Sequence, residues 1–292
     1  MEVEIKKQAF IKMLYICNMI KKIIHVADIH IPNDQKLRPY EEMLMTFLKE
    51  LYKNEIEGQN ADEIRIVICG DTFQNKVRTT NEAKALFHLL LNYCNEMCKT
   101  YIIAGNHDML QNNKDKMDSI NPTFDIEDVY PNVTYLDKYL GFKSGYVEDE
   151  NVVWALYSMY DNFASPNVEH NQFPDSRIIG LYHGDIVGAV TDVGNVRDSG
   201  IDTDLFSECD CVMAGHIHKF QEIKKNGVPI VYSGSLFQKD AGENTTGHGY
   251  VVWNMEDMTY KHVEVTNKYR FFKFKINNYE AFAEDVEDLI NL

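Results

Sequence analysis

Apolar runs and amphipathic stretches alternate along the first third of the chain. The apolar runs predict three buried strands, at 22–27, 63–69 and 101–104. Helical spacing of apolar residues predicts a helix over 39–57, and a second helix that begins at Thr79 or Thr80 and precedes the third strand. This order is typical of a parallel sheet with right-handed crossovers, so we predict an α/β fold.

The pattern changes after a polar, irregular stretch at 111–131, where we expect loop with a short helix. Strand-like segments then follow one another, at 133–136, 151–157, 177–182, 211–214, 219–223, 229–232, 249–254 and 259–265. We expect them to form a second sheet that faces the first across a shared core. Beyond a boundary near Asn267-Lys268, a small C-terminal piece combines a strand-like run at 271–276 with an acidic amphipathic helix at 279–292.

Composition narrows the class of protein. The chain has 292 residues, enough for one large or two modest domains, and its formal net charge is −16. That charge argues against a basic nucleic-acid module, but not against an enzyme that reaches phosphates through bound cations. The spacing of the six cysteines does not match a zinc ribbon, and we expect them to be reduced thiols. No apolar run approaches the ~20 residues of a membrane span, so we expect a cytoplasmic protein. Residues 1–18 are an expected N-terminal extension, either a misassigned start before a natural Met19 or an added amphipathic turn.

Clusters of oxygen and nitrogen donors follow the apolar runs. They are Asp28-Ile29-His30, Gly70-Asp71, Gly105-Asn106-His107-Asp108, His183-Gly184 and Gly215-His216-Ile217-His218. Any one such cluster is more often a solvated loop than a site. Five in a row are much harder to obtain by chance, and ligands of α/β folds gather beyond the carboxyl ends of the strands. We therefore predict one metal site at one edge of a sheet.

The donor chemistry suits two cations. The predicted ligands are two carboxylates, one amide oxygen and four imidazoles, from Asp28, His30, Asp71, Asn106, His183, His216 and His218. A carboxylate such as Asp71 can bridge two ions, which leaves open positions for water and substrate. Because no thiolate takes part, we expect Mn²⁺ first, with Mg²⁺, Fe or Zn²⁺ as alternatives, in a site that can clamp a phosphoryl group.

Four further residues are candidates for function. His107 is not needed as a ligand and is placed to stabilise charge on phosphate or to protonate a leaving oxygen, with Asp108 orienting it. Lys76 and Arg78 are candidate contacts to a nucleic-acid backbone, although two surface cations are usually only solvated.

The ordered motifs D-x-H, G-D, G-N-H-[DE], H and G-H-x-H resemble those of the calcineurin-like metallophosphoesterase superfamily, over roughly residues 19–265. The resemblance implies a two-sheet metallophosphoesterase sandwich flanked by helices, with a small C-terminal appendage. It implies that Asp28, His30, Asp71 and His218 hold one metal ion. It also implies that Asp71, Asn106, His183 and His216 hold the other, with His107 as the catalytic histidine.

Within that superfamily the chain is most similar to the SbcD nuclease group, which repairs DNA breaks with a coiled-coil ABC-type ATPase. The similarity rests on four stretches: Ile23 to His30, Gly70-Asp71-Thr72-Phe73, Tyr232-Ser233-Gly234-Ser235, and Gly242-Glu243 with Gly247-His248-Gly249-Tyr250. Gln74 stands where the group often has His or Asp. Only residues 267–292 follow the expected nuclease domain at 19–266, so we expect a compact, phage-type member or a truncated chain.

Three functions are open at this point. The first is a metal-dependent exonuclease or endonuclease on DNA, which by analogy with the group would form a homodimer and bind an SbcC-type ATPase. The second is a phosphodiesterase or phosphatase of small nucleotide-type substrates, which the acidic charge favours. The third is a non-enzymatic scaffold, which the intact ligand set disfavours.

Overall fold

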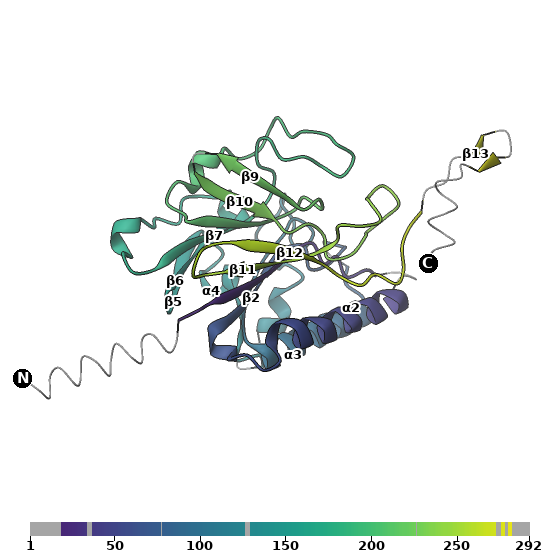
Figure 1. Cartoon of the computed structure of the whole chain (residues 1–292), viewed down its shortest axis with the longest axis horizontal. Helices are drawn as coiled ribbons and strands as arrows, with labels where there is room; N and C mark the ends of the chain where they lie inside the picture. Colours follow the sequence, from purple (N-terminus) through teal and green to yellow (C-terminus); the bar gives the residue numbers. More distant parts are fainter. Residues whose placement is uncertain are drawn as a thin grey trace, which may run out of the picture.

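A computed structural model describes residues 19–33, 37–76, 78–125, 129–225, 227–272, 276–277 and 280–281. Its described part contains two six-stranded sheets that pack face to face, with two long helices on the outside of the first (Figure 1). The predicted α/β two-sheet sandwich is confirmed. No helix within the described ranges is both long enough and apolar enough to cross a bilayer.

The first sheet has the strand order β12-β11-β1-β2-β3-β4. Its strands are β1 (Lys22–Val26), β2 (Ile64–Cys69), β3 (Lys99–Ile103), β4 (Val133–Tyr135), β11 (Gly249–Asn254) and β12 (Tyr260–Glu264). β1 to β4 run parallel, whereas β11 pairs antiparallel with β1. The prediction that all later strands form a separate sheet is therefore wrong for β4, β11 and β12, because their pairing depends on contacts distant in sequence.

The second sheet has the order β5-β6-β7-β8-β10-β9. Its strands are β5 (Gly145–Asp149), β6 (Val152–Tyr157), β7 (Arg177–His183), β8 (Cys211–Gly215), β9 (Gln221–Lys225) and β10 (Val228–Tyr232). The inner strands β6, β7, β8 and β10 are parallel, so their carboxyl ends lie on one side.

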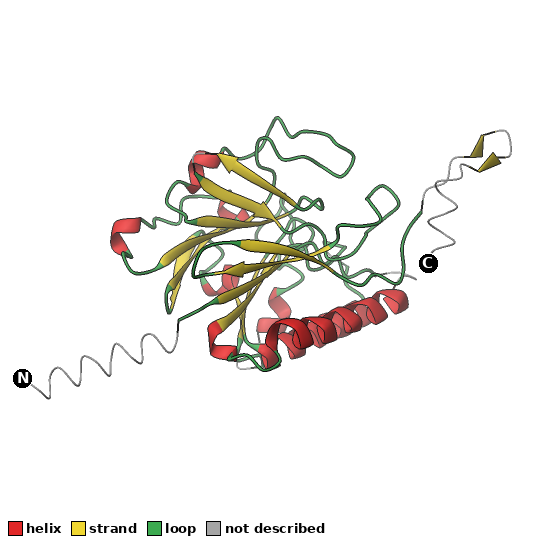
Figure 2. Ribbon diagram, viewed as in Figure 1, coloured by secondary structure: helices red, strands yellow, loops and turns green. Residues whose placement is uncertain are grey.

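Helices α2 (Leu37–Leu51) and α3 (Asn81–Met97) lie side by side against the first sheet (Figure 2). Each buries one apolar stripe, which includes Phe47 in α2 and Phe87 in α3. α2 continues into a π-helical turn, η1 (Tyr52–Ile56), so the predicted helix over 39–57 is confirmed with an earlier start. The Oγ1 of Thr80 accepts a hydrogen bond from the Ala83 amide at 3.2 Å, which caps α3 as predicted.

Alternation along β1 divides the core. Ile24 and Val26 face α2 and α3, whereas Ile23 and Ala27 face the second sheet and pack with residues such as Trp154. The second sheet also carries a third apolar cluster, to which Leu205 and Phe206 of the turn η6 (Thr203–Phe206) contribute. The turns η4 (Met159–Asp161) and η5 (His170–Gln172) lie between β6 and β7 in the chain. This packing fixes both sheets, so the loops that follow their strands are held in place.

Short elements complete the fold: η2 (Ala61–Glu63), η3 (Asn121–Phe124), α4 (Leu136–Tyr139), and the hairpin β13 (Ile276–Asn277) and β14 (Glu280–Ala281). η3 is the short helix expected within 111–131. Glu280–Ala281 are extended where a helix was predicted, and the rest of that helix lies outside the described residues, as do residues 1–18. The cysteines of the described part are free and buried, as predicted for reduced thiols.

Candidate metal centre

The predicted ligands all follow strand ends that meet on one side of the sandwich. Asp28 and Asp71 follow the parallel neighbours β1 and β2, and Asn106 follows β3. His183 is the last residue of β7, and His216 comes directly after β8. Parallel pairing brings strand ends to a common edge, which explains why residues so distant in sequence converge.

A first cluster forms around Asp28, His30 and His218, whose donor atoms all lie within 4.8 Å of one another. The Oδ1 of Asp28 is 3.8 Å from the Nε2 of His30 and 3.7 Å from the Nε2 of His218. The two Nε2 atoms of His30 and His218 are 3.0 Å apart. Asp28 and His30 are buried, so these polar atoms gain little from bulk water.

A second cluster forms around Asp71, His183 and His216, again within 4.8 Å. The Nε2 of His183 lies 3.3 Å from the Oδ1 of Asp71. The Oδ1 of Asn106 lies 2.7 Å from the Nδ1 of His216 and 3.2 Å from the Nε2 of His183. The Oδ2 of Asp71 is also 3.6 Å from the Nε2 of His30, so this carboxylate joins the two clusters.

Hydrogen bonds at the outer ring nitrogens turn the other nitrogens towards the clusters. The Nδ1 of His183 is 2.7 Å from the Cys69 carbonyl, which can only accept, so Nδ1 carries the hydrogen. The Nδ1 of His218 makes the corresponding contact with Glu243 at 2.5 Å. Loss of the Nε2 proton then leaves each ring with a lone pair on Nε2, the form in which imidazole binds a metal ion.

The donors therefore fit divalent cations. In the metal-binding tautomers, the facing Nε2 atoms of His30 and His218 have no hydrogen between them. A cation between the two Nε2 atoms would bind their lone pairs together with the neighbouring carboxylates, and the N/O donor set matches Mn²⁺, Fe or Zn²⁺.

Four predicted ligands are among the ten non-glycine residues of the described part that have positive φ. Asp28, His30 and Asp71 each have φ of 51°, and His216 has φ of 100°. Such conformations cost about 1–3 kcal/mol each and persist only where their surroundings fix them. Here the backbone amide of Asp28 donates to the Gly70 carbonyl and that of His30 donates to the Asp71 carbonyl. The strain is typical of a functional site.

Two glycines allow the clusters to close. A Cβ on Gly105 would lie 2.2 Å from the Asp71 Oδ1, and a Cβ on Gly70 would lie 2.4 Å from the His183 Nδ1. No side chain fits at either position without moving a predicted ligand. The glycines of the G-D and G-N-H-D motifs are therefore explained by close approach.

Charges within the second cluster are strongly coupled. Burial disfavours the charged form of His183, but the charge of Asp71 and its hydrogen bond outweigh burial and raise the pKa of His183 to about 9. Burial acts to raise the pKa of Asp71, but the neighbouring imidazoles outweigh it and hold that pKa well below its usual range. Asp71 is therefore a carboxylate ready to bind a cation.

His107 adjoins both clusters. Its ring centroid lies 4.9 Å from that of His30, in an edge-to-face arrangement. Its backbone amide donates to the Asp71 Oδ1 at 2.6 Å, and its Nδ1 donates to the Gln74 carbonyl at 2.7 Å. The Nε2 of the half-buried ring is thus the nitrogen that can exchange a proton. Burial lowers the pKa of His107 from its usual value, although the charge of Asp71 acts in the opposite direction.

The predicted role of Asp108 is wrong. Its carboxylate does not orient His107. Instead it accepts hydrogen bonds from the backbone amides of Thr72 at 3.2 Å, Phe73 at 2.9 Å and Gly105 at 2.8 Å. The turn places the Asp108 side chain in the interior, where it ties the loop after β2 to the loop after β3. Asp108 is a structural anchor of the site.

Lys76 and Arg78 lie near the site but outside the two clusters. Lys76 is partly exposed and close enough to His107 for its charge to lower the pKa of that histidine. Arg78 is exposed, and its carbonyl accepts a hydrogen bond from the side chain of Asn33. Their contact with a nucleic-acid backbone stays a prediction.

Sequence reasoning did not assign three residues that support the site. Glu243 holds the Nδ1 of His218, and Asp185 has its Oδ2 3.5 Å from the Nε2 of His216. The charge of Lys239 reaches His30, His107 and His218. Glu243 lies in the Gly242-Glu243 stretch, and Asp185 follows His183-Gly184. The sequence motifs therefore include or adjoin both residues but do not indicate that they contact the histidines.

Comparison with known proteins gives the family. The sequence model of the calcineurin-like phosphoesterase superfamily domain matches residues 21–258. The chain belongs to the calcineurin-like phosphoesterase superfamily. Membership implies a phosphoester hydrolase, and the superfamily typically binds divalent metal ions. The two clusters are thus candidate metal sites of a family that uses such sites.

The chain is similar to proteins from a virus, a bacterium and an archaeon. Uncharacterized protein R555 of Acanthamoeba polyphaga mimivirus is 32% identical over 265 residues, which are 88% of this chain but only 19% of that protein. The SbcD component of nuclease SbcCD from Staphylococcus epidermidis is 25% identical, with 92% of this chain and 82% of that protein covered. A solved archaeal phosphodiesterase is 13% identical, with 83% and 98% covered and a TM-score of 0.41.

Proposed function

We propose that this member of the superfamily is a dinuclear-metal-dependent phosphodiesterase that acts as a DNA repair or recombination nuclease of the SbcD type. The observation that carries the proposal is the position of Asp71, whose carboxylate lies 3.3 Å from His183 and 3.6 Å from His30. One carboxylate shared by two clusters is the arrangement that a pair of cations requires. The similarity to the SbcD component of nuclease SbcCD supports the choice of DNA as substrate.

The residues divide the work as follows. Asp28, His30, Asp71 and His218 hold one ion, and Asp71, Asn106, His183 and His216 hold the other. Bound divalent ions, Mn²⁺ first, supply positive charge that polarises a phosphoryl group and activates water for attack. The imidazolium form of His107 would donate its Nε2 proton to the leaving oxygen, which leaves a neutral ring whose Nδ1–H still donates to the Gln74 carbonyl. Asp108 fixes the loops that carry Asp71 and Asn106.

The same proposal includes the domain organisation and the partners. Residues 19–266 form the nuclease domain and 267–292 a short C-terminal segment. The chain works as a homodimer with an SbcC-type ABC ATPase, in the cytoplasm, where its free buried cysteines stay reduced. Lys76 and Arg78 contact the DNA backbone.

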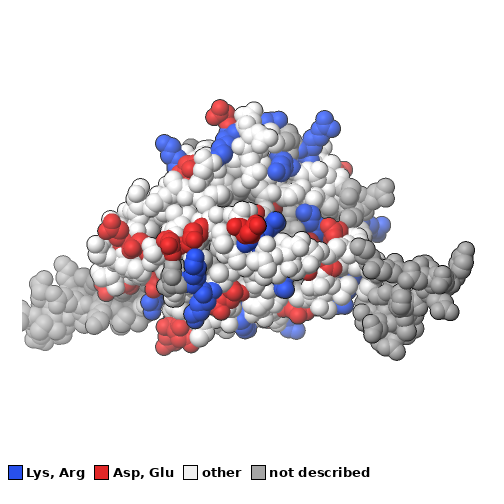
Figure 3. Space-filling model, turned by 90° about the horizontal axis from the view of Figure 1, so that it is seen from above, with Lys and Arg blue, Asp and Glu red and all other residues white. Residues whose placement is uncertain are grey.

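A second candidate is a phosphodiesterase or phosphatase of small nucleotide-type substrates. The net charge of −16 favours it, because a long polyanion is repelled more than a small ester. Figure 3 shows acidic and basic side chains interspersed on the face that it presents.

One assay separates the two candidates. The full chain is incubated with Mn²⁺ and end-labelled linear DNA, in parallel with a chromogenic phosphodiester. Degradation of both supports the nuclease. Hydrolysis of the small ester alone favours the second candidate, and chelation of the metal must abolish either activity.

A further inference from the structure

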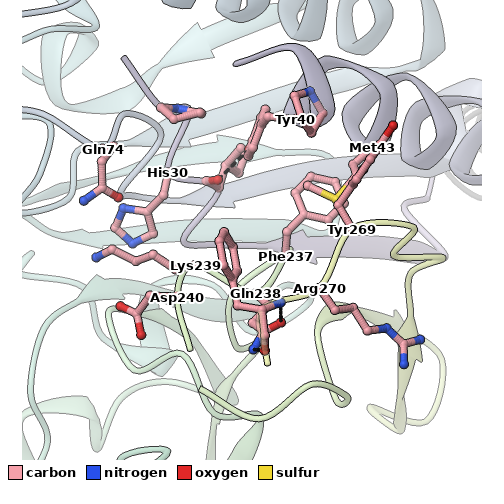
Figure 4. Close-up of a pocket in the computed structure, with 14 residues that line it drawn as sticks. His30, Tyr40, Met43, Gln74, Phe237, Gln238, Lys239, Asp240, Tyr269 and Arg270 are labelled. Atoms are coloured by element: carbon pink, nitrogen blue, oxygen red, sulfur yellow. Dashed lines mark hydrogen bonds between the residues drawn. The ribbon is translucent and has the colours of Figure 1, made fainter. Parts of the chain in front are cut away.

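A cavity of about 490 Å³ opens beside the first metal cluster. It is formed where the start of α2, the loop at 237–240 and the segment at 269–271 come together (Figure 4). His30 forms part of its wall, so the cavity adjoins a predicted metal ligand directly. Its size lies within the range of sites that hold small organic ligands.

Four of the eight apolar residues that line this cavity are aromatic, so we name it the aromatic cavity. Tyr40, Phe237, Tyr269 and Phe271 contribute their rings, beside Met43. The rings of Tyr40 and Phe237 meet edge to face with centroids 5.4 Å apart, and both are almost fully buried. The wall is therefore rigid before any ligand arrives, which lowers the entropic cost of binding.

Hydrogen bonds hold the segment at 269–271 against the body of the protein. The side chain of Gln238 accepts from the Phe271 amide at 2.8 Å and donates to the Phe271 carbonyl at 2.9 Å. The hydroxyl of Tyr269 donates to Glu42 on α2 at 2.6 Å. These contacts fix the side of the cavity that faces away from His30.

Charge distinguishes the two ends of the aromatic cavity. Lys239 extends towards His30 at the end next to the metal ligands, and Arg270 lies at the opposite end (Figure 4). Two cations, Lys239 and Arg270, and one anion, Asp240 beside Lys239, line the cavity, whereas the overall net charge is −16. The cavity thus combines aromatic surface for a flat apolar group with positive charge for an anion.

We propose that the aromatic cavity receives the base of a nucleotide whose phosphate lies at Lys239 and the metal ligands. The inference rests on the proposed phosphodiesterase function and names its substrate as a nucleotide unit, in DNA or free. Aromatic faces stack on any base, so the cavity binds nucleotides with little sequence preference. An alkyl chain would gain area here but no stacking, and it would leave Arg270 without an anion or base edge.

The test compares two esters that share one leaving group. Thymidine 5′-(p-nitrophenyl phosphate) carries a base, and methyl p-nitrophenyl phosphate does not. With the Mn²⁺-loaded full chain, kcat/KM for the thymidine ester should exceed that for the methyl ester. Tyr269→Ala should lower this preference roughly tenfold, through a lower kcat/KM for the thymidine ester. Tyr269→Phe keeps the ring but loses the bond to Glu42, so it should retain the preference.

Tyr139→Ala is the matched control, since this tyrosine is 67% exposed on α4 and does not line the cavity. It should change neither ester. A second readout needs no metal: saturation-transfer NMR of thymidine 5′-monophosphate with the metal-free chain should show the base protons in contact with protein, and Tyr269→Ala should weaken that transfer.

The outcomes separate the two proposals. If neither ester is hydrolysed but the base protons still receive saturation, the phosphodiesterase function fails and the cavity assignment stands. If both esters are hydrolysed equally and the base protons receive none, the cavity assignment is overturned and the hydrolase stands. A preference for a long-chain alkyl p-nitrophenyl phosphate over the thymidine ester also overturns the assignment.

Discussion

Glu243 offers a sharp test of the metal centre, because it acts through His218 alone among the predicted ligands. Its Oε1 accepts from the His218 Nδ1 at 2.5 Å and its Oε2 accepts from the Lys239 amide at 2.8 Å. The Glu243 side chain is only 8% exposed, so water does not replace a lost bond easily. In Glu243→Gln one oxygen becomes an NH₂ group, which faces a donor whichever way the amide is turned.

The expected cost follows from that mismatch. A hydrogen bond to a charged group is worth about 1.5–3 kcal/mol. Its loss should weaken divalent-ion binding at the cluster of Asp28, His30 and His218 roughly 10–100-fold, which is also the usual effect of removing an outer partner of a ligating histidine. Titration of metal-free protein with Mn²⁺ by calorimetry measures this affinity.

Glu264→Gln is the control, because it removes the same charge from an exposed position on β12. It should bind Mn²⁺ as the wild type does. If Glu243→Gln binds both Mn²⁺ equivalents with wild-type affinity, Glu243 does not position His218, and our account of the ligand tautomers is refuted.

Three further predictions concern other parts of the molecule. His107→Asn should reduce turnover of a chromogenic phosphodiester at least roughly 100-fold, since proton transfer contributes about 10²–10⁴ in rate. Calorimetry should still show Mn²⁺ binding to this variant. Loss of metal binding would mean that His107 is a ligand. Burial raises the pKa of Asp137 to about 6, above its unfolded value, so its contribution to stability is present below about pH 4 and lost as the pH rises through about 6. The difference in unfolding free energy between wild type and Asp137→Asn, measured in urea, should therefore change by about 2 kcal/mol between pH 4 and 7. A pH-independent difference would refute the shift. Leu90 is buried in the core on the inner side of α3, so Leu90→Ala should lower the free energy of unfolding in urea by about 2–5 kcal/mol. Leu89 is partly exposed, so Leu89→Ala should lower it clearly less. Equal losses would argue against the packing described.

Local pattern was enough to predict most of the core elements. β2 and β7 are buried along almost their whole length and read as continuous apolar runs. β5 was missed because it begins at Gly145 and alternates between partly and fully exposed positions. Its partner β6 lies beside it and supplies the apolar surface that β5 lacks. Short edge strands of this kind depend on neighbours more than on their own sequence.

Pairing between distant strands was beyond local pattern. Gly249–Asn254 has the same buried character as the strands of the second sheet, yet it pairs with β1 in the first. The periodicity of a strand does not identify the strand with which it pairs. The assignment of all later strands to one sheet therefore failed at β4, β11 and β12.

The sequence predicted the site residues that follow strands. It did not predict the direction of side chains whose orientation is set by a turn. All seven predicted ligands lie in the two clusters or against them. Asp108 is next to His107 in sequence, but the turn sends the two side chains to different partners. The aromatic cavity joins three segments that are far apart in the chain, so only the fold reveals it.

The central claim is that two cations share the carboxylate of Asp71. Crystals of the full chain soaked in MnCl₂ and measured at the manganese absorption edge test it most directly. We predict two anomalous peaks, one on each side of Asp71, the first against His30 and His218 and the second against His183 and His216. A single peak, or peaks away from Asp71, would contradict the claim.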